Sequence, residues 1–340
     1  MCKKNKPDSS DMSFVVQGAV CGPTLGSNLY TKIMCHSIRK YFPKAEIILS
    51  TWKGEDVAGV DYDKIIYAAP IEMTYIIRDD GKVYPHTINH QIVTTKNGIA
   101  LATRKYVVKV RSDLTFLGNG LSKFIGKYND YSNSPEDNVW KIFSERILCL
   151  PTYNPRKRII YPYNICDWIY IGKNNDIKKL FDIPLADVKN LKIRSNNLYP
   201  TIQDNMGAEQ YIWTSCLRKN GLPAILDTAS STANDAIHRS EQALANNVVL
   251  LSAKKLQLKS LKSGYSGYCS EPWLSQGFYT FCEWKRLYNK FAGGKCFFRY
   301  NPVEDILYQI VYNLRNILKT KNSKMYIKIV CLVRKIRGGI

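Results

Sequence analysis

The sequence predicts an α/β fold with a mixed, mainly parallel sheet flanked by helices. Two observations favour this class. Short runs rich in valine and isoleucine, which suit buried strands, alternate with segments whose apolar residues recur at helical spacing. The chain has 340 residues, 45% of them hydrophobic, and can therefore bury one sizeable core, with or without an appended subdomain. Such alternation is typical of a sheet whose loops gather on one edge.

The first part of the chain has the order strand, helix, strand, strand, helix, strand. A glycine-containing loop at residues 18–26 follows the first strand, and Pro43 ends the first helix. The β-branched residues of the last strand suit a central strand that is buried on both faces. The expected segments are strands at residues 13–20, 45–52, 61–67 and 105–114, and helices at residues 31–42 and 89–103.

The second part begins with a loop-rich stretch at residues 128–157, where asparagine, serine, aspartate and proline gather. Residues 158–181 then indicate a strand, a turn, a strand and a helix, and Asp176 is expected to cap that helix. A further helix begins near Glu209 and ends at Gly221, since its apolar residues recur at helical spacing.

The strand at residues 105–114 (KYVVKVRSDL) ends on Asp113, which points to a ligand site. Ligands in open α/β sheets bind outside the carboxyl ends of the strands. A carboxylate at that position can hold a divalent cation, and the cation can neutralise a diphosphate. The alternative is that Arg111 and Asp113, which share a strand face, form only a surface salt bridge.

Six sequence blocks cover, in order, roughly residues 13–291: SFVVQGAV, SIRKYFPKAEIILSTW, HQIVTTKNGIALATRKYVVKVRSDL, DWIYIGKNNDIKKLF, AEQYIW and FCEWKRLYNKF. Together they resemble the WavE lipopolysaccharide-synthesis family, which consists of glycosyltransferase-like proteins from bacterial surface-polysaccharide gene clusters. One position departs from the resemblance. His90 stands where an arginine is expected before the glutamine.

The resemblance implies a GT-A-like, Rossmann-like fold and a transferase that uses a nucleotide-diphosphosugar. In such an enzyme the first strand and its loop bind the base and ribose, and an acidic motif binds metal and diphosphate. Here the motif is Arg-Ser-Asp rather than Asp-x-Asp, so Asp113 is expected to ligate a divalent cation, Mn²⁺ or Mg²⁺, as a single carboxylate. The residues expected to contact the donor are Gln17, Gly18, Thr51, Trp52, His90, Gln91 and Arg111.

The resemblance also suggests a catalytic base. In inverting GT-A enzymes one carboxylate takes the proton from the acceptor hydroxyl, and it commonly lies at the start of a helix beyond the metal-binding strand. Glu209 is the best match, and Asp204 is the second candidate. The alternative is that Glu209 is a first-turn glutamate that the helix dipole favours.

The predicted organisation has three parts. Residues 1–12 are expected to be a disordered N-terminal segment, residues 13–300 a GT-A-like domain, and residues 301–340 a basic, amphipathic, helical C-terminal region. The domain is divided into a nucleotide-sugar half at residues 13–127 and an acceptor half at residues 128–300.

Composition limits the partners. The chain has 49 basic and 28 acidic residues, a formal net charge of +21, which indicates an anionic substrate, surface or partner. Nucleic acid is disfavoured, because the 23 tyrosines are not accompanied by a zinc-finger, RNA-recognition or helix-turn-helix pattern. The ten cysteines form no C-x-x-C pair and are interpreted as reduced thiols.

These observations predict a cytoplasmic glycosyltransferase, peripheral at the inner face of the cytoplasmic membrane. Its donor is expected to be a nucleotide sugar, and its acceptor a lipopolysaccharide-core, capsule or other surface glycan, free or lipid-linked. Two alternatives remain open. One is a catalytically silent scaffold of the polysaccharide assembly machinery, which the single carboxylate of the motif allows, and the other is a basic nucleic-acid-binding protein.

Residues 306–340 contain eight basic residues and no acidic one, which suggests contact with an anionic membrane surface. Each basic residue near such a surface contributes about 1 kcal/mol. Truncation after Asp305 is therefore expected to move the protein from anionic vesicles into solution in co-sedimentation assays, as raised salt should do for the full chain. Unchanged co-sedimentation, or aggregation of the truncated chain, would show that this region has another role.

Overall fold

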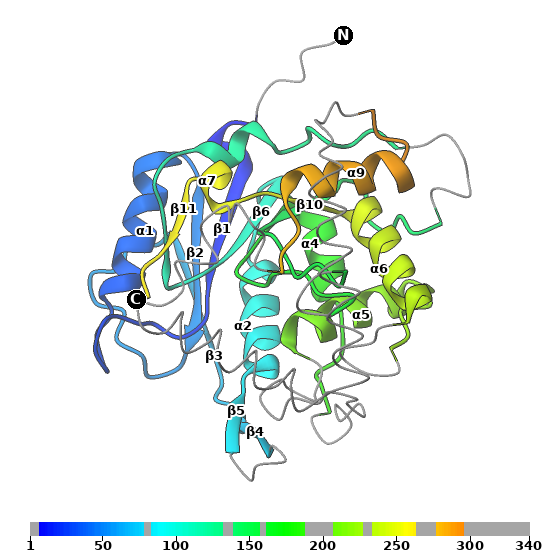
Figure 1. Ribbon diagram of the computed structural model, residues 1–340. Helices are drawn as coiled ribbons and strands as arrows, with labels where there is room; N and C mark the ends of the chain where they lie inside the picture. The colour runs from blue at the N-terminus through cyan, green and yellow to red at the C-terminus, as the bar shows by residue number, and fades with distance from the viewer. Residues whose placement is uncertain are drawn as a thin grey trace, which may run out of the picture.

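A seven-stranded sheet runs through the middle of the computed structural model (Figure 1). The structure describes residues 7–77, 83–131, 139–156, 161–187, 207–226, 233–262 and 277–295. The strands are β1 (Met12–Gln17), β2 (Glu46–Trp52), β3 (Lys64–Ala68), β6 (Tyr106–Arg111), β8 (Ile147–Cys149), β9 (Ile169–Lys173) and β10 (Val248–Leu250). Their order is β10-β8-β9-β6-β1-β2-β3, and β9 runs antiparallel to both of its neighbours. The predicted mixed, mainly parallel sheet is confirmed.

Smaller strand pairs and several helices surround this sheet. β4 (Thr74–Ile77) pairs with β5 (Val83–His86), and β7 (Leu114–Phe116) pairs with β11 (Leu258–Ser260). The helices of the described residues are α1 (Leu29–Tyr41), α2 (Ile88–Ala100), α4 (Asn174–Phe181), α5 (Ala208–Lys219), α6 (Asn234–Asn247), α7 (Ala253–Leu256) and α9 (Phe281–Phe291), with short 3₁₀ turns η1 (Ser9–Asp11) and η2 (Gly120–Lys123).

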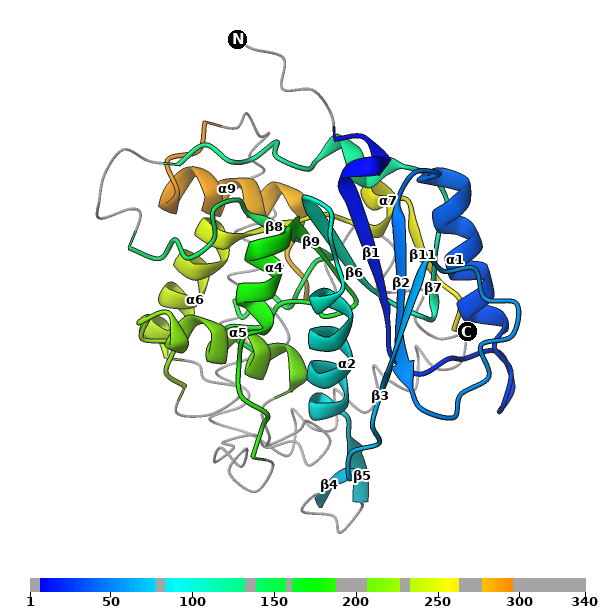
Figure 2. The same ribbon diagram turned by 180° about the vertical axis from the view of Figure 1, so that it is seen from behind.

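Helices cover both faces of the sheet (Figures 1 and 2). α1 lies beside β7 on one face, where the ring of Phe14 contacts those of Phe42 and Phe116 at centroid distances of 4.8 and 5.6 Å. α2 packs on β1 and β2 on the opposite face, with α4 beside it. A Cβ atom at Gly98 of α2 would lie only 2.4 Å from Val15, so glycine allows this close approach.

The register of β1 and β6 decides which side chains reach the α2 face. Val15 is the partner of Lys109, and the next pair on that face is Gln17 with Arg111. Since partners in register point to the same side of a sheet, the two cations of β6 lie on the α2 face. β6 ends at Arg111, and the turn that follows places Asp113 just beyond the carboxyl edge of the sheet.

A buried carboxylate joins α4 to the loop before β8. Asp176, in the first turn of α4, accepts hydrogen bonds from the backbone N–H groups of Ser144 and Glu145 at 2.8 and 3.0 Å. It also accepts one from the Ser144 hydroxyl at 2.8 Å. The expectation that Asp176 caps its own helix is therefore wrong. The N-cap residue is Lys173, and Asp176 instead satisfies polar groups of a neighbouring loop.

Several boundaries differ from those expected. η1 and the start of β1 lie within residues 9–12, part of the segment predicted to be disordered, and residues 1–6 lie outside the described residues. β8 lies inside the predicted loop at residues 128–157, because a strand of three residues is too short to show a pattern. The expected strand at residues 105–114 is divided, since residues 114–116 turn away to pair with β11. The basic region at residues 301–340 lies outside the described residues.

Asp176→Ala is expected to lower the free energy of unfolding by about 2–4 kcal/mol, because it leaves two backbone N–H groups and a hydroxyl without their acceptor. Urea denaturation measures this loss. Asp182→Ala is the matched control at the C-cap of the same helix, since Asp182 is exposed and, among the described residues, forms its salt bridge with Lys219. It should cost less than about 1 kcal/mol. Equal losses for the two variants would contradict this account of Asp176.

Candidate functional site

Two adjoining cavities lie at the carboxyl edge of β1 and β6. We call the first the β1 pocket. It has a volume of about 330 Å³ and is lined by residues of β1, the loop after it, the start of α2, and the turn after β6. The second, the α5 pocket, has a volume of about 420 Å³ and includes the first turn of α5. Both are large enough for a small ligand. The two cavities adjoin, because both are lined by Thr87, Gln91, Arg111 and Asp167, and we call the pair the groove.

The β1 pocket contains most of the residues expected to contact a nucleotide sugar. Gln17 is held by a hydrogen bond from its amide to the Thr94 hydroxyl at 2.8 Å. The ring of His90 packs edge-on against the ring of Trp52, with the two centroids 5.0 Å apart. The predicted residues that line this pocket are Gln17, Gly18, Trp52, His90, Gln91, Arg111 and Asp113.

Glycine is required at the end of β1. Gly18 has a φ angle of +111°, which side-chain-bearing residues rarely adopt. The loop that begins there is joined to the turn after β6, because the Ser112 hydroxyl donates a hydrogen bond to the Ala19 carbonyl at 2.6 Å. The two loops that border the β1 pocket are therefore fixed to one another.

Asp113 is a buried carboxylate that binds two cations. Arg111 donates from Nε to Oδ1 at 3.0 Å and from Nη2 to Oδ2 at 2.7 Å, and Lys262 Nζ lies 2.9 Å from Oδ2. The side chain of Asp113 is only 4% exposed. Burial by itself raises the pKa of this carboxyl, but the hydrogen bonds and charges of Arg111, followed by those of Lys262, outweigh burial and lower the pKa.

A divalent cation does not fit this set of groups. Both oxygens of Asp113 already accept from cationic donors, which would repel Mn²⁺ or Mg²⁺. At a separation of about 4 Å, like unit charges near a protein surface repel by roughly 4 kcal/mol. The described residues also contain no cluster of three or more His, Cys, Asp or Glu side chains that could hold a metal. In these surroundings Asp113 positions Arg111 and does not offer a free ligand.

Lys109 is a fully buried cation behind the groove. Its ammonium donates a hydrogen bond to the main-chain carbonyl of Asp167 and lies 5.5 Å from the centroid of the Tyr170 ring. Burial lowers the pKa of Lys109 to about 8, although the charge of Asp167 opposes the shift. This contact holds the chain before β9 against β6, where the two pockets meet.

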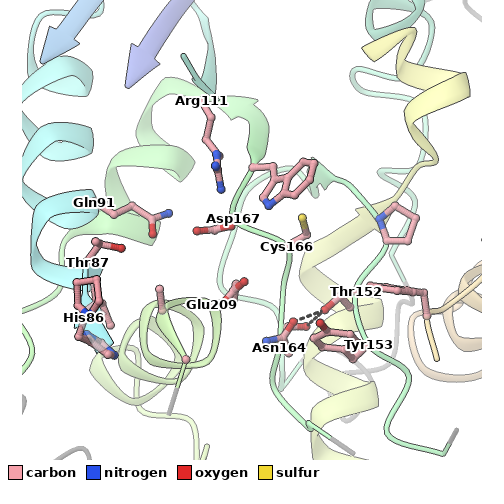
Figure 3. A pocket seen from close by; sticks show the side chains of 17 residues that line it. His86, Thr87, Gln91, Arg111, Thr152, Tyr153, Asn164, Cys166, Asp167 and Glu209 are labelled. Atoms are coloured by element: carbon pink, nitrogen blue, oxygen red, sulfur yellow. Dashed lines mark hydrogen bonds between the residues drawn. The ribbon is translucent and has the colours of Figure 1, made fainter. Parts of the chain in front are cut away.

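Two carboxylates face the α5 pocket. Figure 3 shows Asp167 and Glu209 directed into the cavity, with the guanidinium of Arg111 extending toward them. Glu209 lies in the first turn of α5, as expected. Burial, followed by the charge of Asp167, raises the pKa of Glu209 to about 7. A carboxyl with such a pKa can accept and release a proton near neutral pH.

Another wall of the α5 pocket is aromatic. Tyr153 stacks on Phe278, with ring centroids 4.8 Å apart and planes inclined by 26°. The two segments that carry these rings are joined by main-chain hydrogen bonds, including one of 2.7 Å from the Asn154 N–H to the Gly277 carbonyl. The pocket therefore combines ring faces with carboxylates and amides, as sites for amphipathic small molecules do.

One predicted residue, Thr51, does not line the groove, and another lies outside the described residues. The Thr51 hydroxyl donates to the Glu55 carboxylate, and Thr51 lines neither pocket. Alternation along β2 explains this, since Trp52 is the neighbour that reaches the cavity. Asp204, the second candidate for the base, lies outside the described residues.

The family model for WavE lipopolysaccharide synthesis matches residues 12–321. The chain belongs to the WavE family. Its role therefore lies in lipopolysaccharide synthesis. The search of curated proteins found no match. Within the part of this WavE chain that the structure describes, every helix is too short or too polar to cross a bilayer.

Three charged residues that line the pockets of this WavE protein or lie directly behind them have no role in the sequence analysis: Lys109, Asp167 and Lys262. The sequence could have indicated a role for Lys109, because a single charged residue within a valine-rich strand that is buried on both faces needs a partner. Asp167 stands next to an apolar strand in the same way as Asp113 does. Lys262 carried no such signal, since it reaches Asp113 only through the pairing of β7 with β11.

Glu209→Gln is expected to stabilise this WavE protein at alkaline pH. The folded-state pKa of Glu209, about 7, lies above the unfolded value of about 4.3, so folding favours the protonated form. The free energy of unfolding of the parent falls as the pH rises from the unfolded pKa to the folded pKa. Glutamine has no carboxyl proton to lose, so the variant does not undergo this loss. The variant should match the parent near pH 4.5 and exceed it at pH 8 by on the order of 2 kcal/mol in chemical denaturation.

The control for this measurement is Glu72→Gln, a change of the same kind at an exposed position. Its difference from the parent measures the effect of removing one exposed carboxylate, against which the gain of Glu209→Gln is compared. If Glu209→Gln shows no gain at pH 8 over pH 4.5, the Glu209 carboxyl is not protonated at neutral pH in the folded protein.

Proposed function

We propose that this WavE protein is a glycosyltransferase that moves a sugar from a nucleotide-diphosphate donor to a growing surface glycan. The observation that supports the proposal is the single groove at the carboxyl edge of the sheet. One end of the groove offers aromatic rings and cations, and the other offers a carboxylate with a pKa near 7. A nucleotide sugar and an acceptor hydroxyl need these two environments side by side.

In this proposal the donor occupies the β1 pocket. The edge-to-face pair of Trp52 and His90 offers an apolar surface for the base, and Gln17 and Gln91 offer amide groups for hydrogen bonds. Arg111 is the cation that reaches both pockets, so it suits the phosphate groups, which lie between nucleoside and sugar.

The acceptor occupies the α5 pocket, where Tyr153 and Phe278 offer ring faces to a sugar and Glu209 offers a base. The acceptor hydroxyl attacks the anomeric carbon of the donor as the bond from that carbon to the phosphate oxygen breaks. The nucleoside diphosphate leaves with the electron pair, and Glu209 takes the hydroxyl proton. A pKa near 7 suits this task, because the base is ionised at the working pH and still binds a proton.

The place of action belongs to the same proposal. A lipid-linked glycan acceptor would be presented at the inner face of the cytoplasmic membrane. The net charge of +21 favours an anionic surface, and the acid-free stretch at residues 306–340 is the segment proposed to contact it.

The test is transfer of a radiolabelled sugar from a panel of nucleotide-diphosphate sugars to lipopolysaccharide extracted from a strain that lacks this protein. Glu209→Gln is expected to lower turnover by roughly a hundredfold or more, as the loss of a general base does, while donor affinity stays within a few-fold. The parent's turnover should rise with pH through about 7 as Glu209 loses its proton.

Glu72→Gln is again the control and should leave turnover unchanged, since Glu72 is exposed and lines neither pocket. A fully active Glu209→Gln variant would return Glu209 to the role of a glutamate that the helix dipole favours. Donor binding without transfer to any acceptor would favour the catalytically silent scaffold.

A further inference from the structure

Arg111 has binding capacity beyond its ion pair. Its Nε and Nη2 atoms donate to Asp113, and its guanidinium lies 5.2 Å from the centroid of the Trp168 ring. No acceptor for Nη1 is found among the residues that the structure describes. The guanidinium extends into the groove (Figure 3). A guanidinium held on one edge by a buried carboxylate offers its other edge to a planar anion.

Lys262 is brought to the same place by the main chain. It follows β11, which pairs with β7, and the Leu261 N–H donates to the Asp113 carbonyl at 2.9 Å. The side chain of Lys262 is 43% exposed and lines the β1 pocket. Among the described residues its ammonium pairs with Asp113, which uses one of its three donors and leaves two to face a ligand.

The charges at the meeting point of the two pockets do not cancel. Five charged side chains gather there: Lys109, Arg111, Lys262, Asp113 and Asp167. Three are cations and two are carboxylates, so these five side chains sum to one positive charge, which is offset only when Glu209 loses its proton. A structural ion pair needs only one cation for Asp113. The second cation is in excess at a buried carboxylate that borders a cavity, which is the arrangement expected where an anion binds.

We infer that Arg111 and Lys262 bind the diphosphate of the donor directly, in place of a divalent cation. This inference rests on the proposed function, because it concerns the donor of that reaction. Phosphate oxygens accept from Nη1 of Arg111 and from the ammonium of Lys262, and Asp113 keeps the guanidinium in position. The two cations also stabilise the charge that the departing nucleoside diphosphate acquires. The protein thus needs no metal to neutralise its donor.

Isothermal titration calorimetry of the full-length protein tests this with uridine, guanosine, adenosine and cytidine diphosphates, first in EDTA and then in excess MnCl₂ or MgCl₂. At least one nucleotide is expected to bind in EDTA, with an affinity that the metals change by less than about threefold. Lys262→Gln should weaken its binding by about tenfold or more, as expected when a charge-assisted hydrogen bond is lost. Lys262→Arg should retain most of the affinity.

Lys259→Gln is the matched control, because Lys259 lies exposed on β11, three residues away, and lines neither pocket. It removes the same charge and should leave the affinity within about twofold. Binding that appears only with Mn²⁺ or Mg²⁺ overturns the inference and leaves the proposed function standing, as does binding in EDTA that Lys262→Gln does not weaken. If no nucleoside diphosphate binds in any condition, the proposed function fails, and the inference fails with it.

Discussion

The structure of the groove depends on one buried charge. Lys109 lies in a strand that is otherwise apolar, and an ammonium in such a place is stable only with a partner. That partner is the main-chain carbonyl of Asp167. The contact fixes the chain segment between the two pockets, so the carboxylate of Asp167 stands where it can raise the pKa of Glu209. A neutral residue at position 109 would leave the order of the strands intact and remove the constraint that aligns the two pockets.

Only part of the fold and of the candidate site can be predicted from the sequence. The patterns of apolar residues predict the sheet and its carboxyl edge. Strands that are buried on both faces, such as β1 and β6, are recognisable as short runs of mainly apolar residues. A charged residue next to such a run, as in Arg111 and Asp113, could be placed at that edge. Thr51 was expected there together with Trp52, but alternation along β2 directs its hydroxyl to Glu55 and only Trp52 to the cavity. Lys262 could not be placed there, because long-range strand pairing brings it to Asp113.

The two halves expected from the sequence share one sheet, and both contribute residues to the two pockets. β9 and β8 extend the sheet that β1, β2 and β6 begin, so one continuous sheet supports both pockets. β11 then returns to pair with β7, and Lys262 from the second half lines the pocket of the first. Arg111 belongs to the first half and reaches into the α5 pocket. Side chains from both halves therefore line the place where the two pockets adjoin.

The pairing of β7 with β11 has a consequence for the order in which the molecule is made. The strands that form the floor of the β1 pocket leave the ribosome early, whereas Lys262 follows only after the whole second half of the sheet. Until then Asp113 has a single cation, and the pocket lacks its outer rim. Closing so distant a contact costs chain entropy, and contacts of this kind form more slowly than local ones. A nascent chain therefore acquires the complete rim of the β1 pocket only after Lys262 has been added.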